Sequence, residues 1–282
     1  MGLFKIDFNK PGKGVEKEDL QKHRFLIFFD VIFRKFMKFV QLNLIYLIFS
    51  LPYLLLLYVF SPLNATALAS VEYNGIGEFV KTLTGDTFIG FDLTLRLLFV
   101  FGITVLWGTG PASAGAAYVM RNFSREEHAW VMSDFWDNVK SNFKQSIAIL
   151  FIDIVVIYLS MVAFNFYSMQ YASSPNPVHL IAQGILAFVL IIYTFMHYYI
   201  YQLMISYEAV LVDLYKNAML FCVAKFPQNI FFTVLAFGIV LGLFVLLNVY
   251  AFIAFVLIFT IVCKFIIEFY TSNVIRTTVI QK

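Results

Sequence analysis

Asp153 is a lone carboxylate in an apolar stretch, about 146–169, and no basic residue lies near it in the sequence. An ionisable side chain is costly to place in such surroundings and is therefore a candidate for function. Two interpretations stay open. Asp153 accepts an internal hydrogen bond from a Ser, Tyr or Asn of a neighbouring helix, or it lines a path taken by a solute.

The next apolar stretch, about 179–203, carries a second set of polar groups. Tyr193, His197 and Tyr201 are spaced by four residues, so a helix presents them on one face. Aromatic rings with hydroxyl groups suit stacking against a sugar and hydrogen bonding to it. They also suit the aromatic belt that membrane helices place at the lipid–water interface.

No other group of side chains has the spacing of a catalytic centre or a metal site. Glu126 and Glu127 are adjacent and point in different directions on a helix, and His128 beside them completes no pattern of metal ligands. Cys222 and Cys263 are expected to be free thiols, because neither falls in an expected external loop. We therefore expect a protein that is not an enzyme and that has no metal and no cofactor.

The composition places these residues in a membrane. Of the 282 residues, 61% are hydrophobic and 13% are charged, against roughly 25% charged in soluble domains. The mean hydropathy is +0.82. We expect an all-α integral membrane protein whose partner is the lipid bilayer, and we expect no nucleic acid partner.

Apolar runs of about 20 residues predict about six transmembrane helices in three hairpins. The final run, 230–267, is too long for one span. We divide it at Asn248-Val249-Tyr250 into two helices, with one long tilted helix as the alternative. The expected spans are 39–60, 93–117, 146–169, 179–203 and the two parts of 230–267.

The cations separate to one side of these six spans. Every lysine and arginine except Lys81 and Arg96 falls on the side of the N-terminus. Because lysine and arginine concentrate in cytoplasmic segments, we expect both termini in the cytoplasm.

The chain is expected to form one polytopic domain over residues 1–282, with amphipathic interfacial helices on the cytoplasmic side. Residues 1–38 form a basic amphipathic arm, 61–92 an external acidic loop, and 118–145 a cytoplasmic loop that contains an interfacial helix.

A short sequence motif recurs where spans one, three and five begin. It reads Phe39-Val40-Gln41, Phe143-Lys144-Gln145 and Phe226-Pro227-Gln228. We interpret it as a threefold repeat of an interfacial helix followed by a hairpin. A general need for aromatic and amide groups at the headgroup level is the alternative.

The stretch 108–146 organises the chain around it. Gly108, Gly110 and Gly115 are small residues that permit close helix packing, while Pro111 breaks or kinks a helix. A ligand-facing hinge is the alternative to tight packing. Ser124, followed three residues later by a glutamate, has the form of a capping box and predicts the start of a helix.

A second helix in this stretch, about 133–144, has an apolar face and a polar face. We expect the apolar face to lie in the membrane or on the hairpins. The polar face is left for water or a cytoplasmic partner. The candidate partner contacts in this region are Arg121, Arg125, Glu126, Glu127, Asp134, Trp136, Asp137 and Lys140.

Three segments resemble the YesL-like family of bacterial membrane proteins, which holds a domain of unknown function. They read KPGKGV, FFDVIFRKFMKFVQLNLIYLIFSLP and GTGPASAGAAYVMRNFSREEHAWVMSDFWDNVKSNFKQS, and they cover most of residues 1–150. Members of that family often accompany genes for carbohydrate uptake, including sugar ABC importers, and the family supplies no catalytic residues. The resemblance implies a bacterial plasma membrane protein with a role beside glycan import.

Our leading expectation is a non-enzymatic accessory subunit of a carbohydrate (oligosaccharide) ABC importer. Its partners would be the permease, ATPase or substrate-binding subunits. The second is a self-contained small-molecule or sugar transporter with Asp153 and the aromatic residues of 179–203 along its path. The third is a membrane scaffold or sensor.

Overall fold

The computed structural model describes residues 23–59, 88–247 and 250–280, and it contains no strand within these ranges. Of the expected N-terminal arm, residues 1–22 lie outside the described residues, as do residues 61–87 of the expected external loop. The expectation of an all-α protein is confirmed for the described part of the chain.

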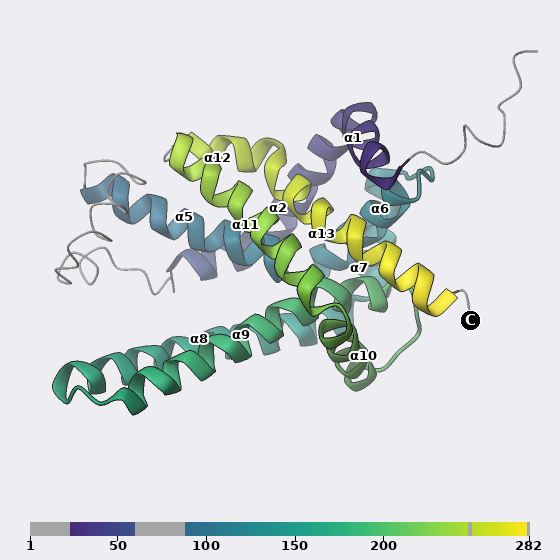
Figure 1. Ribbon diagram of the computed structural model, residues 1–282. Helices are drawn as coiled ribbons and strands as arrows, with labels where there is room; N and C mark the ends of the chain where they lie inside the picture. The colour runs from purple at the N-terminus through teal and green to yellow at the C-terminus, as the bar shows by residue number, and fades with distance from the viewer. Residues whose placement is uncertain (1–22, 60–87, 248–249, 281–282) are drawn as a thin grey trace, which may run out of the picture.

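Among the described residues, five helices are long and apolar enough to cross a membrane. A sixth crossing results if α5 (Phe88–Leu106) and α6 (Pro111–Ser124) form one bent span. Five to six spans agree with the number expected from the sequence (Figure 1). The five are α2 (Phe36–Val59), α8 (Phe143–Ser173), α9 (Pro177–Met204), α11 (Phe226–Leu247) and the final stretch Ala251–Thr278.

A break over residues 107–110 interrupts the second expected span. The axes of α5 and α6 differ by 59° across it. Gly108 and Gly110 have φ angles of 98° and 68°, where a residue with a Cβ is strained. Pro111 then opens α6 at a position where its missing N–H costs no helical hydrogen bond. The range expected for the second span, 93–117, therefore contains a sharp bend, because two glycines and a proline reset the chain direction.

The final apolar stretch forms two helices, as its length predicts. After α11 the chain turns back through α12 (Ala251–Ala254), a π-helical turn η3 (Phe255–Phe259), α13 (Thr260–Ile275) and a second π-helical turn η4 (Arg276–Ile280) (Figure 1). The division expected near residue 248 is confirmed.

The side chain of Asn43 in α2 makes hydrogen bonds to the backbone around the first π-helical turn. Its amide donates to the carbonyl oxygens of Phe255 and Val256, at 2.9 and 2.6 Å. Its side-chain oxygen accepts from the N–H of Ile261 at 2.9 Å. The side chain thus pairs backbone groups where the regular α-helical ladder is interrupted.

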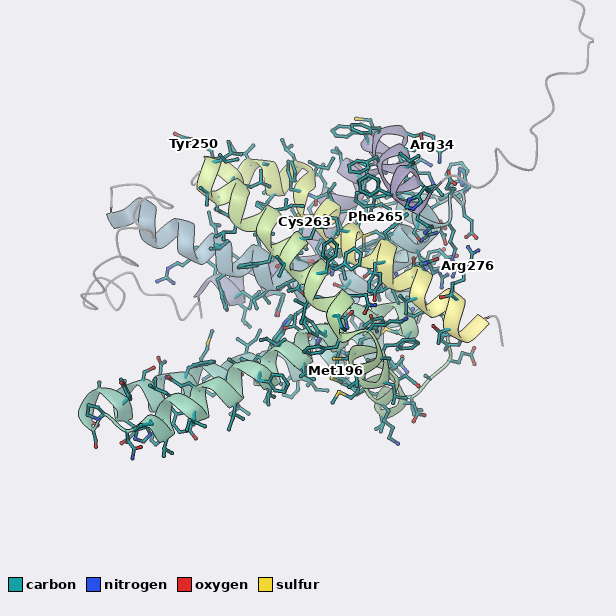
Figure 2. The ribbon with its side chains drawn as sticks, viewed as in Figure 1. Arg34, Met196, Tyr250, Cys263, Phe265 and Arg276 are labelled. Carbon is teal, nitrogen blue, oxygen red and sulfur yellow. The ribbon has the colours of Figure 1, made fainter. Side chains whose placement is uncertain are left out.

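Three short helices precede three of the spans. They are α1 (Arg24–Arg34) before α2, α7 (Val131–Ser141) before α8, and α10 (Leu211–Ala224) before α11. In Figure 1 they lie at the same end of the molecule as the C-terminal turns of α13. We call this the amphipathic end; the tip of the α8–α9 hairpin and α12 lie at the opposite end. Figure 2 shows Arg34 and Arg276 at the amphipathic end and Tyr250 at the other.

One residue joins each short helix to its span, and the backbone has the same form at all three positions. Lys35, Asn142 and Lys225 have φ of −106°, −103° and −118° and ψ of 19°, 11° and 26°. A phenylalanine is the first residue of each following span. In the first of the three units this residue is Phe36. The repeated motif of the sequence places Phe39 there, about one helical turn later.

α6 occupies the interior and packs against α2, α7, α8, α9 and α13. Its alanines, serine and glycine allow this close approach, and most of its residues are buried. A Cβ on Gly115 would lie 2.7 Å from the carbonyl oxygen of Phe135 in α7. The small-residue stretch is therefore a site of tight helix packing.

α8 and α9 pack along each other and diverge from the remaining spans (Figure 1). None of the residues from 154 to 194 is buried. We call this segment the hairpin arm. Apolar grooves run along both of its sides, one of ≈ 250 Å³ between α2 and α8 and one of ≈ 500 Å³ that α9 and α11 line together with Leu106.

Candidate functional site

Asp153 of α8 and His197 of α9 meet inside the protein, and both side chains are fully buried. His197 Nε2 lies 2.9 Å from Asp153 Oδ1, and the hydroxyl of Tyr193 donates to the same oxygen at 2.7 Å. His197 Nδ1 lies 2.9 Å from the carbonyl oxygen of Tyr193. The two separate sets of candidate residues from the sequence thus form one cluster, which we call the Asp–His site.

Trp107, which lies in the break between α5 and α6, covers this site with its indole ring. The indole of Trp107 stacks on the imidazole of His197, with ring centroids 5.4 Å apart and planes at 16°. Its Nε1–H donates to the hydroxyl of Thr194 at 2.8 Å. The ring of Tyr193 meets the same indole edge-on at 5.0 Å.

Polar side chains also pair the backbone that the break leaves without helical partners. The N–H of Gly110 donates to the hydroxyl of Tyr201 at 3.1 Å. The N–H of Thr109 donates to Ser113 Oγ at 2.8 Å, and the hydroxyls of Thr109 and Ser50 lie 2.6 Å apart. These bonds keep the break stable in an apolar interior, where an unpaired backbone group costs several kcal/mol.

The buried oxygens without a hydrogen-bond partner among the described residues include Asp153 Oδ2 and the hydroxyl oxygen of Tyr53. Tyr53 also lines a cavity of ≈ 290 Å³ between α2, α7 and α8, with Thr109, Trp136 and Leu150 among its other walls. Mostly apolar walls with a few polar groups are typical of small-ligand pockets.

A second buried polar cluster joins α9 to α13. The amide of Gln202 donates to the carboxylate of Glu268 and, at 3.3 Å, to the carbonyl oxygen of Ala117. The ammonium of Lys264 lies 5.9 Å from the centroid of the Tyr46 ring. This cluster ties the interior of α6 to its neighbours.

Several of the candidate partner contacts make hydrogen bonds to other residues of this chain. Arg121 donates to the carbonyl oxygen of Ile205 and the hydroxyl of Ser206, both at 3.1 Å. Glu126 accepts from Arg34 of α1 at 2.8 Å. These two residues therefore hold neighbouring segments against the end of α6.

Other residues among the candidate partner contacts also interact with neighbouring parts of this chain. The main-chain carbonyl of Glu127 accepts from the ammonium of Lys35 at 2.8 Å, and Arg125 is half-buried. The carboxylate of Asp134 accepts from the N–H of Trp130 at 2.9 Å and thereby caps α7. Trp136 packs edge-on against the ring of Phe49 at 4.5 Å. Within the set, Asp137 and Lys140 are exposed on α7.

Ser124 is the last residue of α6 and not the cap of a new helix. Its hydroxyl donates to the carbonyl oxygen of Arg121 at 2.7 Å and lies 2.8 Å from the hydroxyl of Ser272. The capping box expected here is wrong, because the small residues of α6 carry the helix through this position.

Charge interactions at the amphipathic end follow from the contact of α1 with α6. The hydrogen bond to Glu126 raises the pKa of the Arg34 guanidinium. Burial lowers the pKa of the Lys35 ammonium, and the neighbouring cations Lys38 and Arg34 lower it further. α1 is thus held by charged groups as well as by aromatic packing.

The Asp–His site pairs a carboxylate with an imidazole, two groups that can exchange a proton. Within the described ranges no three metal-ligating side chains gather. The sequence did not reveal that Asp153 and His197 touch, because 44 positions separate them. Their common placement toward the amphipathic end of two consecutive spans is the signal that points to it.

Comparison with known proteins gives one family match. Residues 93–164 match the family described as "Protein of unknown function, DUF624". The matched range contains the break, α7 and Asp153, while His197 lies beyond it. The comparisons found no matching curated protein and no matching solved structure.

Proposed function

We propose that this chain is a non-enzymatic accessory subunit of a carbohydrate ABC importer in a bacterial plasma membrane. Its spans form three hairpins, each led by an interfacial helix on the cytoplasmic side, and both termini lie in the cytoplasm. The YesL-like resemblance over residues 1–150 supports this setting. So does the basic character of the amphipathic end, where Figure 2 shows Arg34 and Arg276 and where α7 carries Lys140.

The hairpin arm is the observation that carries the proposal. Membrane helices associate through close packing and not through burial of apolar surface from water. The arm has no buried residue, and the nearest spans diverge from it (Figure 1). It therefore offers two helix faces to a partner within the membrane, and we assign that partner as the permease.

A second contact surface lies on α7, at the amphipathic end. Asp137 and Lys140 are exposed there, and the side chain of Trp130 just before the helix is 71% exposed. An exposed aromatic ring beside charged groups is typical of protein contact surfaces. We assign this surface to the cytoplasmic side of the permease or to the ATPase.

The test is photo-crosslinking from the arm in native membranes. Val162 is replaced by a photoreactive phenylalanine derivative, in cells grown on a complex glycan, and the adducts are identified by mass spectrometry. Ile253 on α12 is the matched control, because its side chain is similarly exposed (56% against 48%) and it lies on another helix. The proposal expects permease adducts from position 162 and none from 253. Adducts with lipid alone, or with copies of this chain alone, would contradict it.

A self-contained transporter is the second candidate, favoured by the break beside an ionisable pair. Interrupted helices commonly form the substrate sites of secondary transporters. Uptake of sugar into liposomes by the purified chain would support this function. Unchanged uptake in an Asp153→Asn variant would remove Asp153 from the transport path.

A further inference from the structure

His197 lies between two oxygens that both accept hydrogen bonds. The carbonyl oxygen of Tyr193, 2.9 Å from Nδ1, carries no proton, so Nδ1 must donate to it. Asp153 Oδ1 lies 2.9 Å from Nε2 and also accepts from the hydroxyl of Tyr193. An ionised carboxylate can only accept, so Nε2 must then donate as well.

A neutral imidazole has one N–H and cannot satisfy both contacts with an ionised Asp153. The observed geometry therefore contains one more proton than a carboxylate and a neutral imidazole hold together. That proton lies either on Nε2, which gives an imidazolium beside a carboxylate, or on Oδ1, which gives a neutral pair. In both forms Asp153 and His197 together have no net charge.

Among the residues that the structure describes, we find no positive charge other than His197 that faces Asp153. The titratable groups facing it are tyrosines: Tyr53 from α2, Tyr193 and Tyr201 from α9, and Tyr215 from α10. From the break, Trp107 covers His197 with an uncharged ring. Lys264 and Glu268 belong to the separate cluster around Gln202 and Tyr46. Loss of the shared proton would leave a buried carboxylate without a counter-charge, which is costly inside a membrane.

We propose that Asp153 and His197 form a binding site for one exchangeable proton, and that the structure shows the proton-loaded state. On release, the proton passes to water and no other covalent bond changes. After release Asp153 is ionised and His197 is neutral, and one of the two hydrogen bonds of His197 to oxygen is lost. The unpaired Asp153 Oδ2 is the position at which a solute donor could then replace the missing charge. This inference holds for an accessory subunit and for a transporter alike.

Trp107 reports the state of the site, because a protonated imidazole quenches the emission of an indole stacked on it. The chain has three tryptophans, and the Trp130→Phe/Trp136→Phe background leaves Trp107 as the only one. These changes also remove the contact of His128 with Trp130. In lipid nanodiscs, we expect Trp107 emission to rise in one step as the pH is raised. A flat profile over the pH range in which the protein stays folded would overturn the form in which the proton lies on Nε2, and the NMR measurement below then decides whether the neutral pair forms.

Two substitutions test whether the change in Trp107 emission comes from Asp153 and His197. His197→Gln should abolish it, and Asp153→Asn should change it, because the imidazole then faces a neutral amide in place of a carboxylate. Tyr193→Phe removes one donor to Oδ1 but keeps the pair, so a step should remain. A step that persists in His197→Gln would contradict the assignment.

A second measurement avoids any change at the site. The chain has four histidines, and replacing His23, His128 and His179 by Gln leaves His197 as the only one. The nitrogen NMR spectrum at neutral pH should show Nδ1 protonated, with Nε2 either protonated or sharing its proton with Asp153. A bare Nδ1 would overturn the proposal even if the variants at the site do not fold.

Discussion

Gly115 has no room for a side chain, because α7 lies directly against it. An added Cβ would lie 2.7 Å from the carbonyl oxygen of Phe135 and 2.8 Å from a methyl carbon of Val139. A backbone oxygen cannot rotate away, so the two helices would have to separate. Overpacking of this kind costs roughly 1–3 kcal/mol.

We therefore expect Gly115→Ala to destabilise the protein by about 1–3 kcal/mol, measured by unfolding in detergent. Gly184→Ala in α9 is the matched control, because no atom lies within 4 Å of its added Cβ. The control should unfold like the unmodified protein. Equal stability of the two variants would show that α6 and α7 do not pack as described.

Asn43 is a second position where one side chain supports a neighbouring helix. Asn43→Leu keeps a similar volume but leaves the carbonyls of Phe255 and Val256 and the N–H of Ile261 without their partner. A buried polar group left unpaired costs about 1–3 kcal/mol. The same unfolding assay should show a loss of at least that size, while Asn217→Leu on exposed α10 surface should show little. An unchanged midpoint for Asn43→Leu would contradict the role of this residue.

At the scale of elements, the break between α5 and α6 depends on the backbone of Gly110. Its φ is positive, and an added Cβ would lie 2.9 Å from Leu150 Cβ. We expect Gly110→Ala to lower the yield of folded protein by several-fold, since backbone strain of about 1–3 kcal/mol adds to the clash. Gly102→Ala in α5 serves as the control, because its Cβ would meet only the ring edge of Phe237 at 3.5 Å. Fluorescence-detected size exclusion measures both, and equal yields would argue against a strained break.

The lengths of the apolar runs predicted most of the spans well. α8 and α9 begin and end within about one turn of the expected ranges 146–169 and 179–203. The break was harder to place, because residues 111–117 carry no charged side chain that would mark the end of a span. Pro111 was recognised as a breaker, but the expected span ran through it.

The candidate site was predictable in its parts but not in its assembly. Asp153 and the Tyr193–His197–Tyr201 face stood out because polar groups are rare in apolar runs. Which helices are neighbours, and how each is rotated, decides that Asp153 meets His197. A single sequence carries no direct signal of that. For the same reason the sequence did not show that Arg121 and Glu126 hydrogen-bond to other parts of the chain.

For the whole molecule, the orientation in the membrane can be tested with two cysteines. Ser174→Cys places a thiol at the exposed tip of the hairpin arm, and Lys140→Cys places one on exposed α7 surface. Cys222 and Cys263 are buried and should give little background. A membrane-impermeant maleimide should label position 174 in intact cells and position 140 only after permeabilisation. The reverse pattern would place the termini outside.

The length of α8 and α9 links the shape of the protein to the thickness of its bilayer. α8 has 31 residues and is about 46 Å long at 1.5 Å per residue, whereas the hydrocarbon core is about 30 Å thick. Such hydrophobic mismatch is relieved by leaning or by local stretching of the lipid. A thin bilayer makes the hairpin lean further from the other spans, and a thick one draws it upright. Lipid composition therefore sets the angle between the hairpin arm and the other spans.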